Sequence, residues 1–242
     1  MQFYFIRHGQ SENNLLWLRT GDSQGRSEDP DLTSVGQQQA QRVARFLERV
    51  APVVANGFHG RDGQNVTGFD LTHLYTSLML RAVATGTMIA QVLALPLIGW
   101  KDLHETGGIF LDDGDSGERL GLPGKNRAYF ESHFPNLVLP EDLGDEGWWN
   151  RPFEEYEDRP LRAQRVLREL LERHGGTGDR VAVVSHGGFF NHLLGAILSL
   201  PEDGAPWLSM NNTAITRIDF DEERVSLRYL NRVDFLLREL VT

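Results

Sequence analysis

The sequence contains no cysteine, and this absence removes several kinds of chemistry at once. Without thiols the chain can form no disulfide, no thiolate zinc site and no cysteine nucleophile. Long apolar runs are lacking too, because the most apolar stretch, 181–200, is interrupted by Ser185, His186 and Asn191 and makes a poor membrane span. The amino terminus shows no basic segment followed by a long apolar core, so we expect no signal peptide and a cytoplasmic location.

The chain also lacks an excess of positive charge. Its formal net charge is −10 over 242 residues, which argues against nucleic acid or an acidic membrane surface as a partner. A small anionic substrate remains compatible with this charge, since a local cluster of arginines can bind one. Apolar residues make up 40% and charged residues 24% of the chain, as in ordinary globular proteins.

Short apolar runs alternate with longer helical patterns, which is typical of a parallel sheet with crossover helices. We therefore predict an α/β fold, a three-layer sandwich in which helices flank a mostly parallel central sheet. The predicted strands are 2–6, 71–77, 97–103 (a short edge strand), 181–185, 214–220 and 224–230. The predicted helices are 11–19, 34–50, 79–94, 161–174 and 189–200.

No internal repeat and no flexible linker divides the chain, so we predict one domain over residues 1–242. Two insertions are expected within it, at about 51–70 on the surface and at 106–158. The second is acidic, with thirteen Asp or Glu against four Lys or Arg, and we interpret it as a cap or lid. Trp148, Trp149 and Phe153 either cover a pocket and select the leaving group or anchor the insertion by aromatic packing.

Three predicted strands end in residues suited to chemistry. The first leads into Arg-His-Gly at 7–9, the second reaches Arg81 one helical turn later, and the third leads into His-Gly-Gly at 186–188. Ligands of parallel sheets bind outside the carboxyl ends of the strands. If these strands are neighbours, two arginines and two histidines share one small volume.

Such a cluster would repel itself unless an anion neutralised it, and a phosphoryl group fits. Guanidinium groups bind its oxygens in pairs, and helix amino termini add backbone donors. We expect Gly9 and Gly187 to let the backbone approach the ligand closely. Neighbouring guanidinium charges should depress the pKa of His8 and leave an imidazole nitrogen free to attack phosphorus. Each signal is weak alone, since Arg81 could be a solvated helix residue and His186 a hydrogen-bonded strand end.

Six segments together resemble the histidine phosphatase superfamily, which includes cofactor-dependent phosphoglycerate mutases and many phosphomonoesterases. The similarity runs in the family's order along nearly the whole chain. The matching segments are RHGQSENN (7–14), DLTSVGQQQA (31–40), YTSLMLRAVATGTMIA (75–90), LHETGGIF (103–110), VAVVSHGGF (181–189) and NNTAITRIDF (211–220).

The resemblance implies a role for each matching residue. His8 would accept the phosphoryl group, and Arg7, Arg81 and His186 would form the phosphate pocket. Glu105 would protonate the leaving oxygen and then activate water, although acids at 102, 113 or 118 compete for this role. The substrate-binding set would be Ser11, Asn14, Thr20, Gly21 and Gly187. The scheme requires no metal and no other cofactor.

Two departures favour a hydrolase over a mutase. The 106–158 segment has nothing like the arginine pair of the mutases, and Gly188 stands where mutases commonly have asparagine. The preferred function is a metal-independent phosphomonoesterase that acts through phosphohistidine on a small phosphorylated metabolite. The alternatives are a phosphoglycerate mutase-type phosphotransferase and a non-catalytic binder of phosphorylated ligands. The sequence leaves the oligomeric state open, with a homodimer as one option.

Metal binding finds no support in the sequence. The acidic run DDGD at 112–115 fails the EF-hand spacing and is better interpreted as a solvated loop. The histidines outside the predicted site show no zinc-binding spacing: His59, His73, His104, His133, His174 and His192.

Overall fold

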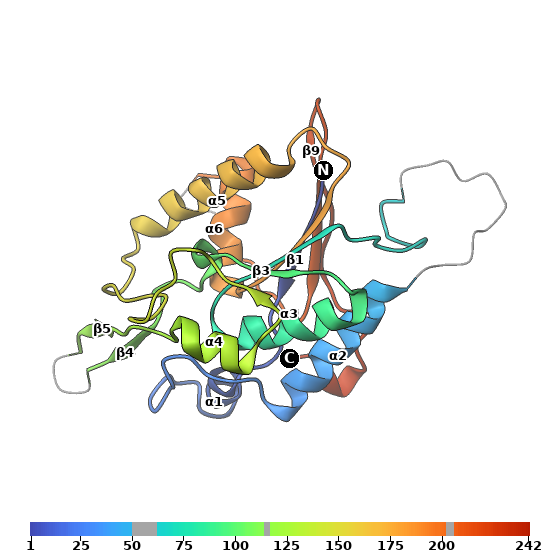
Figure 1. The fold of residues 1–242 in the computed structure, drawn as a ribbon. Helices are drawn as coiled ribbons and strands as arrows, with labels where there is room; N and C mark the ends of the chain where they lie inside the picture. Colours follow the sequence, from blue (N-terminus) through green and yellow to red (C-terminus); the bar gives the residue numbers. More distant parts are fainter. Residues whose placement is uncertain (50–61, 114–116, 202–205) are drawn as a thin grey trace.

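The computed structural model describes residues 1–49, 62–113, 117–201 and 206–242, which form an α/β sandwich around a seven-stranded sheet (Figure 1). Across the sheet the strands are β6 (Leu137–Val138), β3 (Leu97–Gly99), β2 (His73–Thr76), β7 (Arg180–Ser185), β1 (Gln2–Arg7), β8 (Ile215–Phe220) and β9 (Val225–Arg232). Five adjacent strands are parallel, β8 pairs antiparallel with the outermost of them and β9 pairs antiparallel with β8, so the prediction of a mostly parallel sheet is confirmed.

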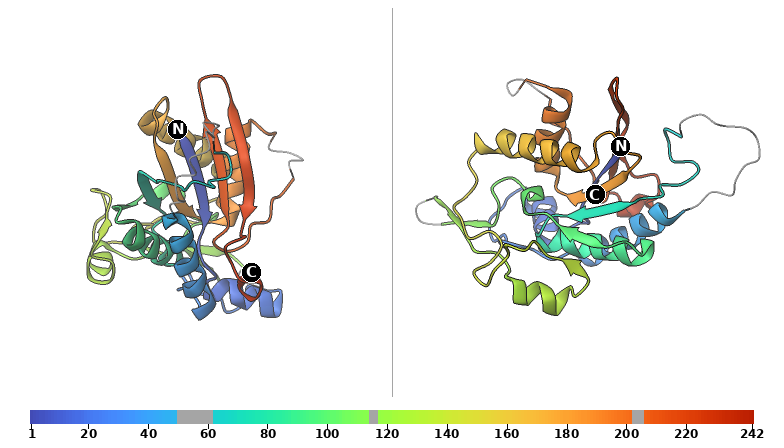
Figure 2. Two further views of the ribbon diagram at one scale, coloured as in Figure 1. Left: turned by 90° about the vertical axis from the view of Figure 1, so that its right-hand side faces the viewer. Right: turned by 45° about the horizontal axis from the view of Figure 1, so that its top comes forward.

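Helices cover both faces of the sheet (Figures 1 and 2). On one face lie α2 (Ser34–Glu48) and α3 (Leu80–Leu93), and on the other lie α5 (Asp158–His174) and α6 (Gly187–Leu198). Side chains of β1 alternate between the two cores, because successive residues of a strand point to opposite faces. Tyr4 and Ile6 pack with α2 and α3, whereas Phe3 and Phe5 pack with α5 and α6.

The remaining described elements are short. They are α1 (Glu12–Thr20), the 3₁₀ turn Lys101–Leu103, the hairpin β4 (Phe110–Asp112) and β5 (Arg119–Gly121), α4 (Arg127–His133) and the 3₁₀ turn Arg238–Leu240. No helix in the described ranges is long and apolar enough to cross a bilayer.

The prediction of an edge strand at 97–103 is wrong in two respects. The strand ends at Gly99 and a 3₁₀ turn follows, and β6 pairs with β3 on its outer side, with Leu97 opposite Leu137. The 106–158 segment therefore returns to the sheet and extends it. Strand β6 is only two residues long, so it is too short to show the alternation of apolar and polar residues by which a strand is recognised in a sequence.

Trp148 and Trp149 are buried inside the 106–158 segment rather than exposed over a pocket. The ring centroid of Trp149 lies 4.6 Å from that of His104. The backbone of Gly108, at φ +78°, passes so close that a Cβ atom would lie 2.0 Å from the Trp149 ring. These contacts favour the interpretation in which the tryptophans anchor the insertion. Phe153 instead packs edge-on against Phe110 of the hairpin, at 4.7 Å.

The first predicted insertion is only partly on the surface. Within it, Phe69 is 1% exposed and packs against Tyr4, with ring centroids 5.6 Å apart. The side-chain amide of Asn65 donates to the Tyr4 hydroxyl at 2.8 Å. Residues 62–70 thus close one side of the core, while 51–61 lie outside the described residues.

Candidate active site

The three strands that carry the predicted chemistry are neighbours, in the order β2, β7 and β1. Beyond the last pair of β1 and β7, the backbone N–H of His8 donates to the Ser185 carbonyl at 2.9 Å. On the other side of β7, the N–H of Ser77 donates to the Val184 carbonyl at 3.0 Å. The sheet therefore brings the ends of all three strands to one edge, as predicted.

His8 is held in a single tautomer by its two partners. Its Nδ1 lies 2.6 Å from the Gly9 carbonyl, which can only accept, so Nδ1 carries the proton. Its Nε2 accepts a hydrogen bond from Nε of Arg81 at 3.2 Å, and an arginine can only donate. Burial, together with the Arg81 and Arg7 charges, lowers the pKa of His8 well below its usual value. Nε2 thus keeps a lone pair, which is the form that a nucleophile requires.

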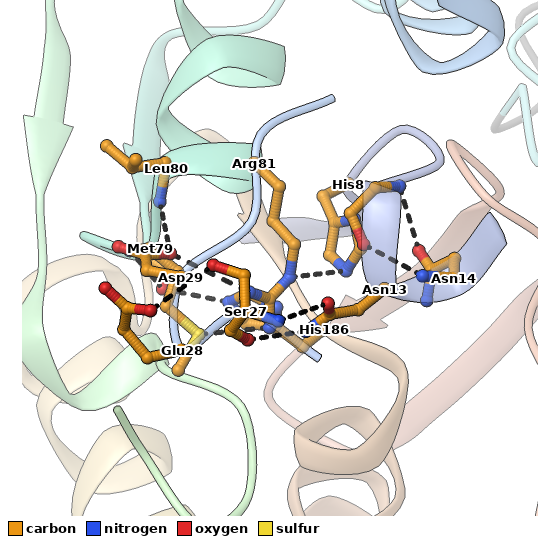
Figure 3. Close-up of polar contacts among 12 residues, drawn as sticks. His8, Asn13, Asn14, Ser27, Glu28, Asp29, Met79, Leu80, Arg81 and His186 are labelled. Atoms are coloured by element: carbon orange, nitrogen blue, oxygen red, sulfur yellow. Dashed lines mark hydrogen bonds and ion pairs between the residues drawn. The ribbon is translucent and has the colours of Figure 1, made fainter. Parts of the chain in front are cut away.

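Arg81, near the start of α3, lies between His8 on one side and Asp29 and Met79 on the other (Figure 3). Its NH1 lies 3.8 Å from Oδ1 of Asp29, and the same oxygen accepts from the Leu80 N–H at 3.0 Å. Burial raises the pKa of Asp29 to about 7, against the opposing effect of Arg81. This carboxyl orients the guanidinium from behind, and nothing in the sequence distinguished it from its acidic neighbours.

Arg7 reaches the same site from the end of β1. One of its terminal nitrogens donates to the carbonyl of Met210, which holds the side chain in place. Its Nε is buried and has no hydrogen-bond partner among the described residues. A buried donor without a partner is costly, so this N–H is available to an anion.

His186 is the amino-terminal cap of α6 and is completely buried. Its Nε2 lies 2.9 Å from the Ser77 hydroxyl, and its ring centroid lies 5.0 Å from that of His8. Burial and the Arg81 charge lower the pKa of His186 well below its usual value. Its Nδ1 has no partner among the described residues, whereas both nitrogens of His8 have one.

Glu105 sits against the amino terminus of α6. Its carboxylate accepts hydrogen bonds from the backbone N–H groups of Thr106 (2.8 Å), Gly188 (3.1 Å) and Phe189 (2.8 Å). Three backbone donors therefore fix the position of this carboxyl group at the start of α6. A Cβ at Gly188 would lie 2.4 Å from Glu105 Oε1, so a larger residue at this position would displace the Glu105 carboxyl group.

At Gly187 a Cβ would lie 3.5 Å from Arg7 Nε, an ordinary contact, so no described residue of the protein requires a glycine there. The prediction that Gly187 lets a ligand approach the backbone stays a prediction. At Gly9 a Cβ would lie 2.5 Å from the Gly36 carbonyl oxygen. Gly9 therefore makes room for the start of α2.

Arg7, His8, Arg81 and Glu105 line one cavity of about 180 Å³, whereas His186 is not part of its lining. Its lining includes six of the predicted site residues: Arg7, His8, Ser11, Asn14, Arg81 and Glu105. It also includes six residues that the sequence analysis missed: Asn13, Leu16, Trp17, Asp22, Ser23 and Arg26.

Of the predicted substrate-binding residues, only Ser11 and Asn14 line the cavity. Ser11 and Asn14 cap α1 reciprocally, and Asn14 Oδ1 also accepts from the Asn212 amide at 3.2 Å. Because that oxygen is occupied, Asn14 has its NH₂ group left for a ligand. Thr20 and Gly21 end α1, are exposed and do not line the cavity. The Thr20 hydroxyl lies 2.9 Å from the Leu16 carbonyl instead.

The model of the histidine phosphatase superfamily (branch 1) matches residues 3–57 and 61–233 of this sequence. The chain belongs to the histidine phosphatase superfamily.

The sequence relatives of this chain are named as mutases, whereas the solved structures that share its fold are phosphatases. A protein of Photorhabdus laumondii named probable phosphoglycerate mutase is 26% identical over 220 residues, covering 91% of this chain and 85% of that protein. Phosphoserine phosphatase of Entamoeba histolytica, solved with 3-phosphoglyceric acid, has a TM-score of 0.61 at 22% identity, covering 98% and 99% of the two chains. A mycobacterial glucosyl-3-phosphoglycerate phosphatase has a TM-score of 0.60 at 20% identity, covering 96% and 99%. These two structures share the fold.

The acids at 102, 113 and 118, which were the alternatives to Glu105 as proton donor, do not line the cavity. Asp102 pairs with Arg165 at 3.6 Å, while Asp113 and Glu118 lie by the β4–β5 hairpin. Asp22 does line the cavity, and its Oδ1 accepts from the Gln24 N–H at 2.6 Å. Glu105 therefore differs from Asp22 in being anchored to the helix that follows His186.

Arg26 is the most informative of the missed residues. It comes from the loop between α1 and α2, and its guanidinium lies 4.0 Å above the Phe110 ring of the hairpin. Burial and the Arg81 charge lower the pKa of Arg26. It adds a third guanidinium to a cavity that already has two. A single arginine in a polar loop gives no periodic or spacing signal, so sequence reasoning had no means to select it.

Proposed function

We propose that the protein is a metal-independent phosphomonoesterase that forms a phosphohistidine at His8. The observation that carries this proposal is the tautomer of His8, which leaves Nε2 unprotonated beside Arg81. Nε2 attacks phosphorus while the bond to the leaving oxygen breaks, and Glu105 gives that oxygen a proton. Water then attacks the phosphohistidine and loses its proton to Glu105, which releases phosphate and restores His8.

The charges around the cavity support an anionic substrate. Arg7, Arg26 and Arg81 place three cations around His8, and fixed cations can stabilise the charge on the equatorial oxygens of a transferring phosphoryl group. Small-molecule sites commonly enclose about 300–1,000 Å³. A cavity of about 180 Å³ therefore favours a small phosphorylated metabolite.

A phosphoglycerate mutase-type phosphotransferase is the second candidate, and the names of the sequence relatives favour it. Side-chain contacts argue for the phosphatase. Arg127 of the 106–158 segment donates to the carbonyls of Leu143 and Pro140, and Arg151 stacks on Trp149 at 4.0 Å. Both arginines contact other residues of the 106–158 segment, and neither lines the cavity.

The deciding experiment is a screen of phosphorylated metabolites without added metal, with a chelator present. It includes 3-phosphoglycerate with 2,3-bisphosphoglycerate, and p-nitrophenyl phosphate as a general substrate. We expect phosphate release from one or more monoesters. Faster formation of 2-phosphoglycerate than of free phosphate would establish the mutase, and phosphate binding without turnover would establish a binder.

Rapid quenching with a labelled substrate tests the intermediate. We expect an acid-labile, base-stable phosphoenzyme in the wild type and none in His8→Ala, which should also lose hydrolysis while keeping its circular dichroism spectrum. The matched control is His133→Ala, because His133 is exposed on α4 and outside the cavity. Label on a serine, or normal turnover by His8→Ala, would refute the covalent route through His8.

A further inference from the structure

A second group of ionisable side chains lies away from the cavity. His73 begins β2, His174 ends α5, and Asp179 precedes β7. Each offers a ligand atom, and these atoms all lie within 4.8 Å of one another. The imidazole ring centroids are 4.5 Å apart, and Nδ1 of His174 lies 2.9 Å from Oδ2 of Asp179. The three positions are too far apart in sequence to show a zinc-binding spacing.

We propose that His73, His174 and Asp179 bind a divalent transition-metal ion, with Zn²⁺ as the best match. Two imidazoles and one carboxylate form a ligand set that suits Zn²⁺ at ligand distances of about 2.0–2.2 Å. In a tetrahedral arrangement, neighbouring ligand atoms are then about 3.3 Å apart. Small side-chain rotations bring atoms already within 4.8 Å to that separation. Water would fill the fourth position.

Hydrogen bonds on the outer sides of both imidazoles support this assignment. Nε2 of His174 lies 3.0 Å from the Tyr75 hydroxyl, and Nδ1 of His73 lies 2.9 Å from the Thr72 hydroxyl. If each of these nitrogens carries the proton, the other nitrogen of each ring has a lone pair for the metal. Metal-binding histidines commonly have such a partner, which sets the tautomer and ring orientation.

The backbone holds the Thr72 hydroxyl in position. This hydroxyl accepts from the Arg180 N–H at 3.0 Å and lies 3.2 Å from the Arg180 carbonyl, to which it can donate. Its remaining lone pair can then accept from His73. The outer partner of His73 is thus set by the pairing of β2 with β7 and is not free to rotate away.

Access to the site is open on one side. The side chain of His174 is 4% exposed and that of Asp179 is 28% exposed. His73 is half-buried. Without metal, His174 and Asp179 share a hydrogen bond. A metal ion would replace the proton between them and draw in His73, so no new element has to move.

The position of the site indicates a structural role. His73 starts β2, whereas Ser77, which contacts His186, follows the other end of the same strand. A metal here would join β2, the end of α5 and the start of β7 without touching the cavity around His8. An ion that binds only the folded state stabilises it, so the melting temperature should rise with the concentration of the ion.

The test is calorimetric titration of chelator-treated protein with Zn²⁺. Vanadate is added at saturation, so that the cavity around His8 is occupied. We expect one equivalent of Zn²⁺ to bind and to raise the melting temperature. His73→Gln and Asp179→Asn should each weaken binding at least tenfold. The matched control is His133→Gln, an exposed histidine that should leave binding unchanged.

Substitution with Co²⁺ provides a second measurement that does not depend on variants. Tetrahedral coordination by two imidazoles and a carboxylate gives visible absorption bands, which His73→Gln should remove. Zn²⁺ affinity that is equal in wild type, His73→Gln and Asp179→Asn would overturn the proposal. The absence of both heat and Co²⁺ bands in the wild type would do the same.

Discussion

Arg162 of α5 forms a buried two-point ion pair with Glu154. Its Nε donates to Oε1 at 2.5 Å and its NH2 donates to Oε2 at 2.8 Å. The same arginine donates through NH1 to the carbonyls of Asp102 (2.8 Å) and His104 (3.0 Å). Glu154 accepts in turn from the Gly107 N–H at 3.2 Å. The pair therefore holds the loop that carries Glu105 on both sides of that residue.

We predict that Glu154→Gln lowers kcat by about tenfold for an alkyl phosphate, with KM within about twofold. The amide keeps the shape but weakens the charged bonds that position the loop, and bonds to charged groups contribute about 1.5–3 kcal/mol. Steady-state kinetics measure both constants. The control is Glu169→Gln, which removes an exposed partner of Arg173 on the same helix. A rise in KM at constant kcat would contradict a positioning role.

Glu105→Gln should reveal the proton donor through its dependence on the leaving group. Alkyl alcohols need a proton to leave, so kcat for an alkyl phosphate should fall by about 10²–10⁴. p-Nitrophenolate leaves readily without one, so its phosphate should lose less. Asp22→Asn changes the other acid in the cavity lining and should leave the ratio of the two rates unchanged. Equal losses for both substrates in Glu105→Gln would exclude the acid role.

Arg26→Gln should affect substrates that carry a second anionic group. Arg81 donates to His8, whereas the Arg26 guanidinium lies over the Phe110 ring of the hairpin. We therefore expect Arg26, which also lines the cavity, to contact the part of the substrate beyond the phosphoryl group. KM should rise about tenfold for a phosphorylated acid and little for p-nitrophenyl phosphate. Arg119→Gln is the control, since Arg119 stacks on Phe153 outside the cavity lining.

Trp149→Ala should lower stability rather than change substrate ranking. The side chain is 4% exposed and fills the space beside His104 and Gly108. Removal of a buried tryptophan costs about 3–5 kcal/mol of unfolding free energy. Denaturant unfolding measures this loss, with Trp207→Ala as the control, because Trp207 is 64% exposed. If Trp149→Ala instead changed the substrate ranking at near-normal stability, the tryptophans would cover the pocket and select the leaving group.

Three histidines should make the protein sensitive to acid. Burial lowers the pKa values of His8, His104 and His186 well below normal, so the folded state binds fewer protons than the unfolded state as the pH falls below about 6.5. Each can remove up to about 1.4 kcal/mol per pH unit in that range. Asp29 acts in the opposite direction, because its pKa is raised to about 7 and the folded state holds its proton.

Urea unfolding between pH 5 and 8 measures the net effect. We expect the unfolding free energy to be greatest above pH 6.5 and to fall on acidification. His104→Gln should reduce the slope, whereas His133→Gln, at an exposed position, should not. A flat profile in the wild type would contradict the depressed pKa values.

The sequence alone predicted the order of the main strands and helices and the cluster of His8, Arg81 and His186 at the strand ends. Apolar periodicity predicted β1, β2, β7 and the helices after them, because strand and helix periods are local properties. The residues that follow those strands, His8, Arg81 and His186, could be selected because parallel strands end at one edge. Their catalytic roles stay predictions.

Only the tertiary structure decided how this cluster is supported. Arg162 lies eight positions from Glu154 but about sixty from the carbonyls of Asp102 and His104 that it holds, and His73 meets His174 across two elements. The same holds for Arg26 and for the anchoring of Glu105 on α6. Such contacts depend on how whole elements pack against one another, and no local period or spacing encodes that.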